Sequence, residues 1–147
     1  MTEKKRTVYI AAAGTGGHVM PGLAVARELK ARGWEVAWLG TTTGMESDLV
    51  GREGIPFMGL NFQGVRGRGL LGAVKGGLKL IQAFFAARSV LAEARPTIIF
   101  STGGYIAVPV GFAARSLGIP LVMMNCDADL LMSTNTLLKV CQAVACG

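Results

Sequence analysis

A glycine-rich segment directly after a short apolar run constrains the fold of this chain more than any other feature. The apolar run covers residues 8–13, and residues 14–18 read Gly-Thr-Gly-Gly-His. A buried strand that leads through a glycine turn into a helix forms an anion cradle, because the glycines let the backbone approach the ligand and the helix N-terminus presents free N–H groups. His18, on this turn, is the one histidine of the chain. The segment therefore predicts a site for phosphate chemistry.

The rest of the chain alternates apolar runs with stretches of helical periodicity. Most of the runs are continuous, as expected for strands that are covered on both faces. The predicted strands are 7–12, 35–39, 55–60, 97–101, 121–125 and 143–146, and the predicted helices are 21–31, 45–52, 70–94, 104–117 and 130–139. Gly33, Gly54 and Gly118 stand where helix C-caps belong.

This order predicts an α/β fold, a doubly wound, Rossmann-like parallel sheet with right-handed crossovers. Ligands of such sheets bind at the carboxyl ends of the strands. Two glycine turns, 14–17 and 103–104, fall at the ends of predicted strands. This coincidence favours one shared cleft over two unrelated loops.

Length and composition indicate one globular domain. The 147 residues are 51% hydrophobic and 16% charged, which excludes a disordered chain. Three cysteines without a C-x-x-C pair argue against a disulfide framework and against zinc, and they favour a reducing cytoplasm. A basic start, Lys4-Lys5-Arg6, precedes the first apolar run, but six residues are too few for a signal peptide, so we expect a solvated tail.

The glycine turn does not match the common nucleotide-binding fingerprints. A dinucleotide site needs a glycine where Val19 stands, and an acidic residue at the end of the second strand, which instead runs into Gly40 and three threonines. A P-loop needs Gly-Lys-Ser/Thr after the turn, and none follows. We therefore expect no cofactor, and the sequence shows no carboxylate cluster that predicts a metal site.

Positive charge is concentrated in the middle of the chain. Residues 54–92 contain no Asp or Glu, while the whole chain has a net charge of +6. Their basic residues are Arg66, Arg68, Lys75, Lys79 and Arg88. On the predicted helix, the two lysines share one side, next to an apolar stripe formed by Leu71, Val74, Leu78, Ile81 and Phe85.

Two interpretations of this basic, apolar helix stay open. It is either a core helix with a solvated lysine face, or a helix that lies on an anionic membrane surface. It cannot cross a bilayer, because the lysines interrupt the run well short of the roughly 20 apolar residues that a span needs. Nucleic acid is not an expected partner, since no aromatic platform is interleaved with the basic residues.

Several motifs together resemble one known family. They are the long segment 14–26 with Met20-Pro21-Gly22, then 38–41, 45–50 and 64–69, and finally 102–105 with 116–120. Over nearly the whole chain this pattern closely resembles the MurG family, the bacterial N-acetylglucosaminyltransferases of peptidoglycan synthesis.

The resemblance implies the N-terminal, acceptor-binding half of a two-domain GT-B enzyme without a metal requirement. That family moves N-acetylglucosamine from UDP-GlcNAc to lipid I, making lipid II, at the cytoplasmic face of the bacterial inner membrane. The donor-binding C-terminal domain would be absent from residues 1–147, so we expect no turnover by this chain alone.

The resemblance also implies roles for individual residues. His18 would act as the general base that activates the acceptor hydroxyl, or would position the substrate. The substrate-binding residues would be Gly14, Thr15, Gly16, Gly17, Arg66, Arg68, Gly103, Gly104 and Tyr105. The membrane-facing residues would be Leu71, Val74, Lys75, Leu78, Lys79, Ile81 and Phe85.

One segment departs from the family pattern. Where many members carry His-Glu-Gln-Asn after the fifth strand, this chain has Met124-Asn125-Cys126-Asp127. Asp127 takes the place of the donor-contacting Asn, Asn125 is near enough to replace it, and a carboxylate facing a UDP-sugar would be repulsive. The alternatives are a stand-alone membrane-associated acceptor subunit of a split transferase, a non-catalytic module that binds lipid diphosphates, and, least favoured, a dinucleotide-dependent oxidoreductase.

Overall fold

A computed structural model describes residues 6–12, 16–41, 46–60, 69–103, 106–125 and 143–146, with backbone alone at 16–18, 69–76, 103, 125 and 143–146. The strands are β1 (Thr7–Ala12), β2 (Glu35–Thr41), β3 (Phe57–Leu60), β4 (Ile98–Gly103), β5 (Leu121–Asn125) and β6 (Ala143–Cys146). The helices are α1 (Gly16–Ala31), α2 (Glu46–Arg52), α3 (Gly69–Ala94) and α4 (Ala107–Leu117).

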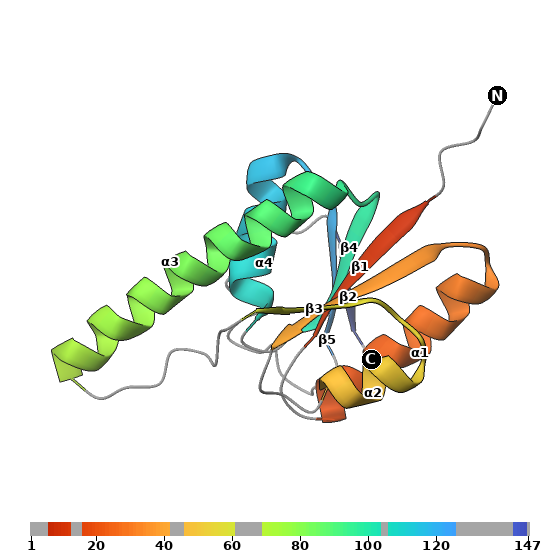
Figure 1. Cartoon of the computed structure of the whole chain (residues 1–147), viewed down its shortest axis with the longest axis horizontal. Helices are drawn as coiled ribbons and strands as arrows, with labels where there is room; N and C mark the ends of the chain where they lie inside the picture. Colours follow the sequence, from red (N-terminus) through yellow and green to blue (C-terminus); the bar gives the residue numbers. More distant parts are fainter. Residues whose placement is uncertain are drawn as a thin grey trace.

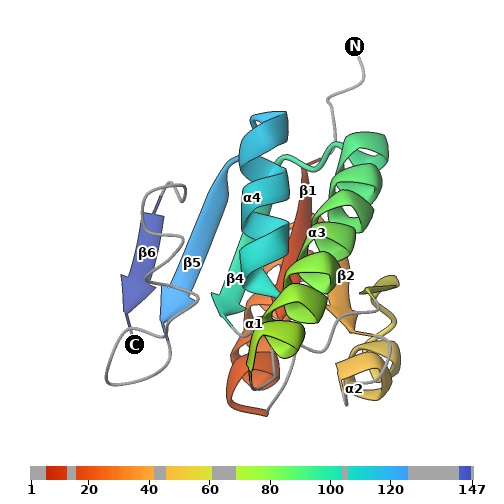
Figure 2. The same ribbon diagram turned by 90° about the vertical axis from the view of Figure 1, so that its left-hand side faces the viewer.

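The strands form one parallel, six-stranded sheet in the order β3-β2-β1-β4-β5-β6. The chain starts in the middle at β1, moves outward through β2 to β3, and then crosses to the other side of β1 to form β4. Figure 2 shows β6, β5, β4 and β1 in sequence across the sheet. The predicted doubly wound, Rossmann-like sheet is confirmed.

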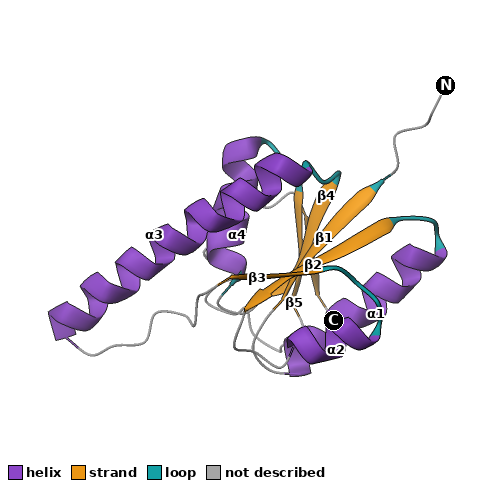
Figure 3. Ribbon diagram, viewed as in Figure 1, coloured by secondary structure: helices purple, strands orange, loops and turns teal. Residues whose placement is uncertain are grey.

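Helices cover both faces of the sheet, as Figures 1 and 3 show: α1 and α2 lie on one side of the strands, and α3 and α4 lie on the other. Successive side chains of β1 point to opposite faces of the sheet, so this strand contributes to a hydrophobic core on each face. Val8, Ile10 and Ala12 belong to the core under α1 and α2. Ala11 belongs to the core under α3 and α4, with Tyr9 packed against it.

The predicted glycine C-caps are confirmed. Gly33, Gly54 and Gly118 have φ angles of +88°, +69° and +70°, a region that a side chain makes unfavourable. At the end of α4, the N–H of Gly118 donates to the carbonyl of Arg115 at 3.2 Å, and the next N–H, of Ile119, donates to Ala114 at 2.9 Å. These bonds satisfy carbonyls that the helix leaves free.

One predicted boundary is wrong in a way that matters for the site. The first helix begins at Gly16, not at Pro21, so Pro21 lies inside α1. Proline removes one hydrogen bond of the helix, and here burial outweighs that cost, because Val19, Leu23 and Ala26 are packed against the sheet. As a result, Gly16, Gly17 and His18 belong to the first turn of α1 rather than to a preceding loop.

Smaller differences concern other ends. The strands β2 and β4 extend to Thr41 and Gly103, β3 begins at Phe57, and α4 begins at Ala107. The predicted helix 130–139 lies outside the described residues. Among the helices of the described segments, none combines the length and the apolar character that crossing a membrane requires.

Candidate functional site at the carboxyl ends of the strands

The strand order places two glycine segments side by side. The order in which the chain adds strands reverses between β1 and β4, and ligands of doubly wound sheets bind outside the carboxyl ends at such a switch point. The last residue of β1, Ala12, pairs with Gly103, the last residue of β4. The helix α1 begins four residues beyond Ala12. The carboxyl ends of the two strands that lead into the glycine segments are therefore neighbours, while the shared cleft stays a prediction, because Gly14, Thr15 and Gly104 lie outside the described residues.

Several predicted site residues gather at this edge. Gly16, Gly17 and His18 form the start of α1, whose N–H groups and dipole favour an anion. Asn125 ends β5, and Ser101 of β4 pairs with Met123 two residues before the ends of both strands. The edge thus combines a helix N-terminus with the ends of three neighbouring strands.

The other predicted site residues lie outside the described residues. They are Gly14, Thr15, Arg66, Arg68, Gly104, Tyr105 and Asp127. Their roles stay predictions, as does the choice between the Asn125 and Asp127 side chains for the donor. Within the described segments, no group of three or more His, Cys, Asp or Glu side chains is placed to hold a metal ion.

Two polar side chains that the sequence analysis missed hold the end of β1. The Ser101 hydroxyl donates to the carbonyl of Ala11 at 2.7 Å, and the Trp38 indole N–H donates to the carbonyl of Ala12 at 3.0 Å. Both donors are buried. In the sequence, the one indication of these two residues is a polar group, a hydroxyl or an indole N–H, within a mostly apolar strand.

A third missed residue, Glu46, organises the end of β2. Its Oε1 accepts hydrogen bonds from the backbone N–H of Thr41 at 2.7 Å and from the Thr41 hydroxyl at 2.6 Å. The carboxylate is fully buried, and Oε2 has no hydrogen-bond partner in the described part of the chain. A Cβ on Gly40 would lie 2.8 Å from the Glu46 Cγ and 2.7 Å from the Phe57 ring, so only glycine fits there.

The resolved pKa shifts belong to groups on other parts of the molecule. Burial and the nearby charge of Glu93 raise the pKa of the Tyr9 phenol. The hydrogen bond from Arg27 holds the pKa of the Glu53 carboxyl below its ordinary value, and the same ion pair raises the pKa of Arg27. This pair joins α1 to the residue after α2 on the surface.

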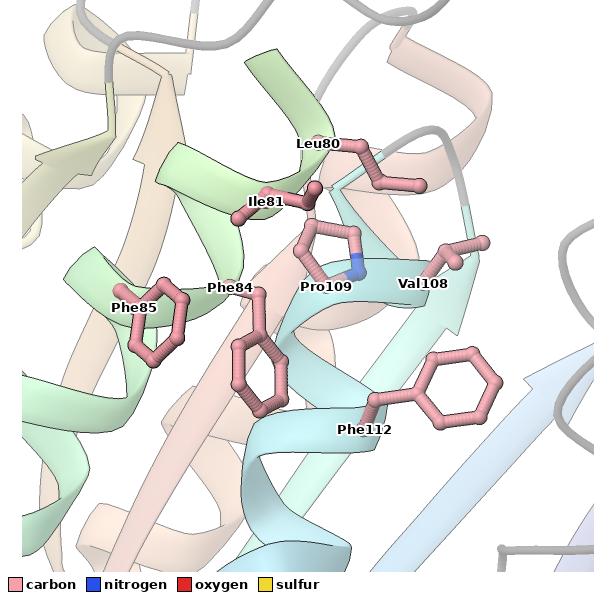
Figure 4. A pocket seen from close by; sticks show the side chains of 7 residues that line it. All are labelled: Leu80, Ile81, Phe84, Phe85, Val108, Pro109 and Phe112. Atoms are coloured by element: carbon pink, nitrogen blue, oxygen red, sulfur yellow. The ribbon is translucent and has the colours of Figure 1, made fainter. Parts of the chain in front are cut away.

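An open apolar groove lies between α3 and α4. It has a volume of about 440 Å³, and Figure 4 shows its lining side chains, which come from both helices. They are Leu80, Ile81, Phe84, Phe85, Val108, Pro109 and Phe112. We call these residues the α3–α4 groove.

The predicted apolar stripe of α3 lies exposed beside and within this groove. Leu78, Ile81 and Phe85 keep 56%, 54% and 61% of their surface exposed, and Lys79 is exposed among them. Phe84 instead packs against the core, with its ring 5.2 Å from that of Phe85 and nearly perpendicular to it. The remaining members of the predicted membrane-facing set, Leu71, Val74 and Lys75, lie in the part of α3 where the backbone alone is described.

Comparison with known families identifies the fold and its lineage. The model of the glycosyltransferase family 28 N-terminal domain matches residues 8–146. The chain belongs to this family. The resemblance to MurG is confirmed by curated relatives named UDP-N-acetylglucosamine--N-acetylmuramyl-(pentapeptide) pyrophosphoryl-undecaprenol N-acetylglucosamine transferase. The protein of Chromobacterium violaceum is 52% identical over 97% of this chain and 39% of its own length. That of Herminiimonas arsenicoxydans is 47% identical over 97% of this chain and 40% of its own length.

Solved structures agree with this family 28 assignment. Acinetobacter baumannii MurG matches with a TM-score of 0.86 and 38% identity, over 96% of this chain and 41% of the MurG chain. A glycosyltransferase from Rickettsia africae has a TM-score of 0.71 at 14% identity, over 97% of this chain and 37% of its own, which shows a shared fold. The family 28 chain described here thus spans about two fifths of the length of these relatives.

Proposed function

We propose that this chain is the acceptor-binding part of a transferase that moves N-acetylglucosamine from UDP-GlcNAc to lipid I, forming lipid II in peptidoglycan synthesis. One observation carries the proposal: α1 begins with Gly16, Gly17 and His18 four residues after Ala12, which pairs with Gly103 at the switch point of the sheet. The chain that forms this sheet is 52% identical, over 97% of its length, to a relative named as a transferase of this type. The donor-binding part would come from a further domain or a partner chain, so the 147 residues alone would not turn over.

The chemistry of the edge supports a division of roles. The backbone N–H groups at the start of α1 would bind the diphosphate of the acceptor, because a helix N-terminus favours negative charge. His18 would accept the proton of the attacking sugar hydroxyl, since the unperturbed pKa of histidine lies near neutral pH. Arg66, Arg68 and Tyr105 would complete the acceptor site, and Asn125 would lie toward the donor.

The chain would lie peripherally on the cytoplasmic face of the inner membrane, and the exposed side chains of α3 support binding to a membrane surface. Three apolar side chains of α3, each more than half exposed, stand next to Lys79 on a helix that has no acidic residue before Glu93. Apolar side chains that enter the headgroup boundary together with basic residues that attract anionic lipids give reversible binding to a membrane surface. The lipid tail of the acceptor would then lie beside this surface.

A parallel titration of the chain tests the acceptor assignment. The ligands are a soluble lipid I analogue with a shortened prenyl chain, UDP-GlcNAc, and NAD as a control for a dinucleotide site. Binding of the analogue with weak or absent binding of UDP-GlcNAc supports an acceptor domain. Binding of NAD, or no affinity for the lipid diphosphate, refutes it.

Completion of the chain tests the transfer reaction. A chimera would join this chain to the C-terminal portion of the Chromobacterium violaceum relative, and its activity would be measured with UDP-GlcNAc and the lipid I analogue. Transfer by the chimera but not by the 147-residue chain supports the proposal. A chimera that binds both ligands without turnover would instead favour a module that binds lipid diphosphates.

A further inference from the structure

The ladder between β1 and β4 is irregular at the carboxyl ends of the two strands. Ala11 pairs with Ser101, but the next residue, Ala12, pairs with Gly103, so Thr102 is one extra residue in β4. On the other side, the pairing of β1 with β2 ends at Ala11 and Leu39. The last two carbonyls of β1 therefore lie where the regular ladder stops, and buried carbonyls need partners.

Side chains from the two neighbouring strands supply these partners. Ser101 of β4 donates its hydroxyl to Ala11 at 2.7 Å, and Trp38 of β2 donates its indole N–H to Ala12 at 3.0 Å. Trp38 and both alanines have no exposed surface, and Ser101 has 1%. Because water does not reach these carbonyls, the loss of either donor would remove a buried hydrogen bond that water cannot replace.

The Trp38 ring also contacts the helix that follows the turn. A Cβ on Gly22 would lie 2.7 Å from Cη2 of Trp38, so the ring lies directly against the backbone of α1. The same indole thus touches the end of β1 through its N–H and the second turn of α1 through its outer edge. Only residues 13–15 separate these two elements.

We propose that Trp38 and Ser101 are positioning residues for the end of β1 and the start of α1. Their hydrogen bonds fix the orientation of the last two peptide groups of β1. The Trp38 ring, in addition, sets the distance between the end of β1 and α1. This role rests on the proposed function, in which the start of α1 binds the acceptor diphosphate. Sites that bind a phosphate through backbone N–H groups need those groups held within fractions of an ångström, so supports of this kind affect affinity without touching the ligand.

Two substitutions remove the donors. Ser101→Ala removes only the hydroxyl, whereas Trp38→Phe keeps an aromatic ring but removes the indole N–H together with the outer part of the indole that contacts α1. The matched control is Trp34→Phe, because Trp34 precedes β2 at the opposite edge of the sheet, where its ring lies 5.8 Å from the Arg6 guanidinium carbon.

The first readout needs no ligand. Amide hydrogen exchange of the labelled chain is compared at Met20 and Gly22, near the start of α1, and in the middle of α4 as the measure of global stability. We expect exchange at the start of α1 to accelerate about tenfold more than in α4 for both variants, as the loss of a buried hydrogen bond predicts. The control Trp34→Phe should change both regions equally. If Trp38→Phe and Ser101→Ala change exchange at the start of α1 and in α4 equally, the proposal is overturned.

A double-mutant cycle tests the contact between Trp38 and α1. Gly22→Ala places a methyl group 2.7 Å from the Trp38 ring and should accelerate exchange at the start of α1 in the same way. In the Trp38→Phe background the outer part of the indole is gone, so the added methyl group should cause much less acceleration. An equal effect of Gly22→Ala in both backgrounds would contradict the role of the ring.

The second readout is affinity for the soluble lipid I analogue. We expect Trp38→Phe and Ser101→Ala to weaken binding about tenfold, and Trp34→Phe to leave it within twofold. Failure of the unsubstituted chain to bind would refute the proposed function, while the exchange data would still decide whether the two residues hold the start of α1. Altered exchange together with unchanged affinity would overturn the positioning role and leave the proposed function standing.

Discussion

Phe85 offers the sharpest test of the membrane surface. It is 61% exposed on α3, where it lines the α3–α4 groove. Full burial of a phenylalanine side chain stabilises by about 1.5–3 kcal/mol, so insertion of the exposed part into a membrane boundary is worth about 1–2 kcal/mol. Phe85→Ala should therefore lower the partition coefficient onto vesicles about 5-fold to 30-fold. The free energy of unfolding should fall by only about 1 kcal/mol, chiefly through the lost edge-to-face contact with Phe84.

The assay is flotation of the chain with vesicles that contain anionic phospholipid and no lipid I. Met20→Ala is the matched control, because Met20 is 50% exposed but lies on α1, which covers the opposite face of the sheet. Lys79→Gln should weaken binding to anionic vesicles about fivefold, as expected for one surface charge, and should leave binding to neutral vesicles unchanged. Binding of Phe85→Ala within twofold of the unsubstituted chain, or an equal loss for Met20→Ala, would refute the assignment of this surface.

Three further predictions concern single side chains. Glu46→Ala should reduce the free energy of unfolding by about 3 kcal/mol, because it leaves two buried Thr41 donors unsatisfied. Glu46→Gln keeps an acceptor and should cost about 1 kcal/mol. Denaturant unfolding measures both losses, and equal losses would contradict the role of Oε1. Arg27 lowers the folded-state pKa of Glu53, so the ion pair stabilises the fold at neutral pH, and this contribution is lost as the pH falls through the folded-state pKa. The thermal midpoints of Glu53→Gln and the unsubstituted chain should therefore differ at pH 7 and converge well below pH 4.5. A difference that stays constant with pH would refute this role of the pair. In the chimera, His18→Ala should lower the transfer rate about 10²–10⁴-fold if His18 is the base, and a loss below tenfold would reduce it to a structural role.

The elements of the fold were largely predictable because they depend on local patterns. Continuous apolar runs marked the strands, and glycines that adopt positive φ marked three helix ends. The start of α1 was predicted wrongly at Pro21 because proline is a local signal, whereas the helix begins earlier through burial of Val19 and Leu23 against the sheet. The local preference of a residue is overridden where packing stabilises the fold by more than the lost hydrogen bond costs.

The candidate site was predictable only in part. Glycine turns at strand ends were visible in the sequence, and so were His18 and the family motifs. The supports of these turns were not visible, because Ser101 and Ala11 are 90 positions apart and Trp38 and Ala12 are 26 apart. A hydroxyl or an indole in an apolar strand does not indicate which carbonyl it will meet.

By itself, the sequence determined the class of the fold and the family, since apolar runs and helical periodicity follow from backbone geometry alone. The tertiary structure decided which elements are neighbours. It placed β4 beside β1, so that Ala12 pairs with Gly103, and it left Phe85 exposed while the half-buried Phe84 packs against the core. These outcomes depend on packing between segments that are distant in the sequence. Periodicity indicates the direction in which a side chain points, but not the residue that it will contact.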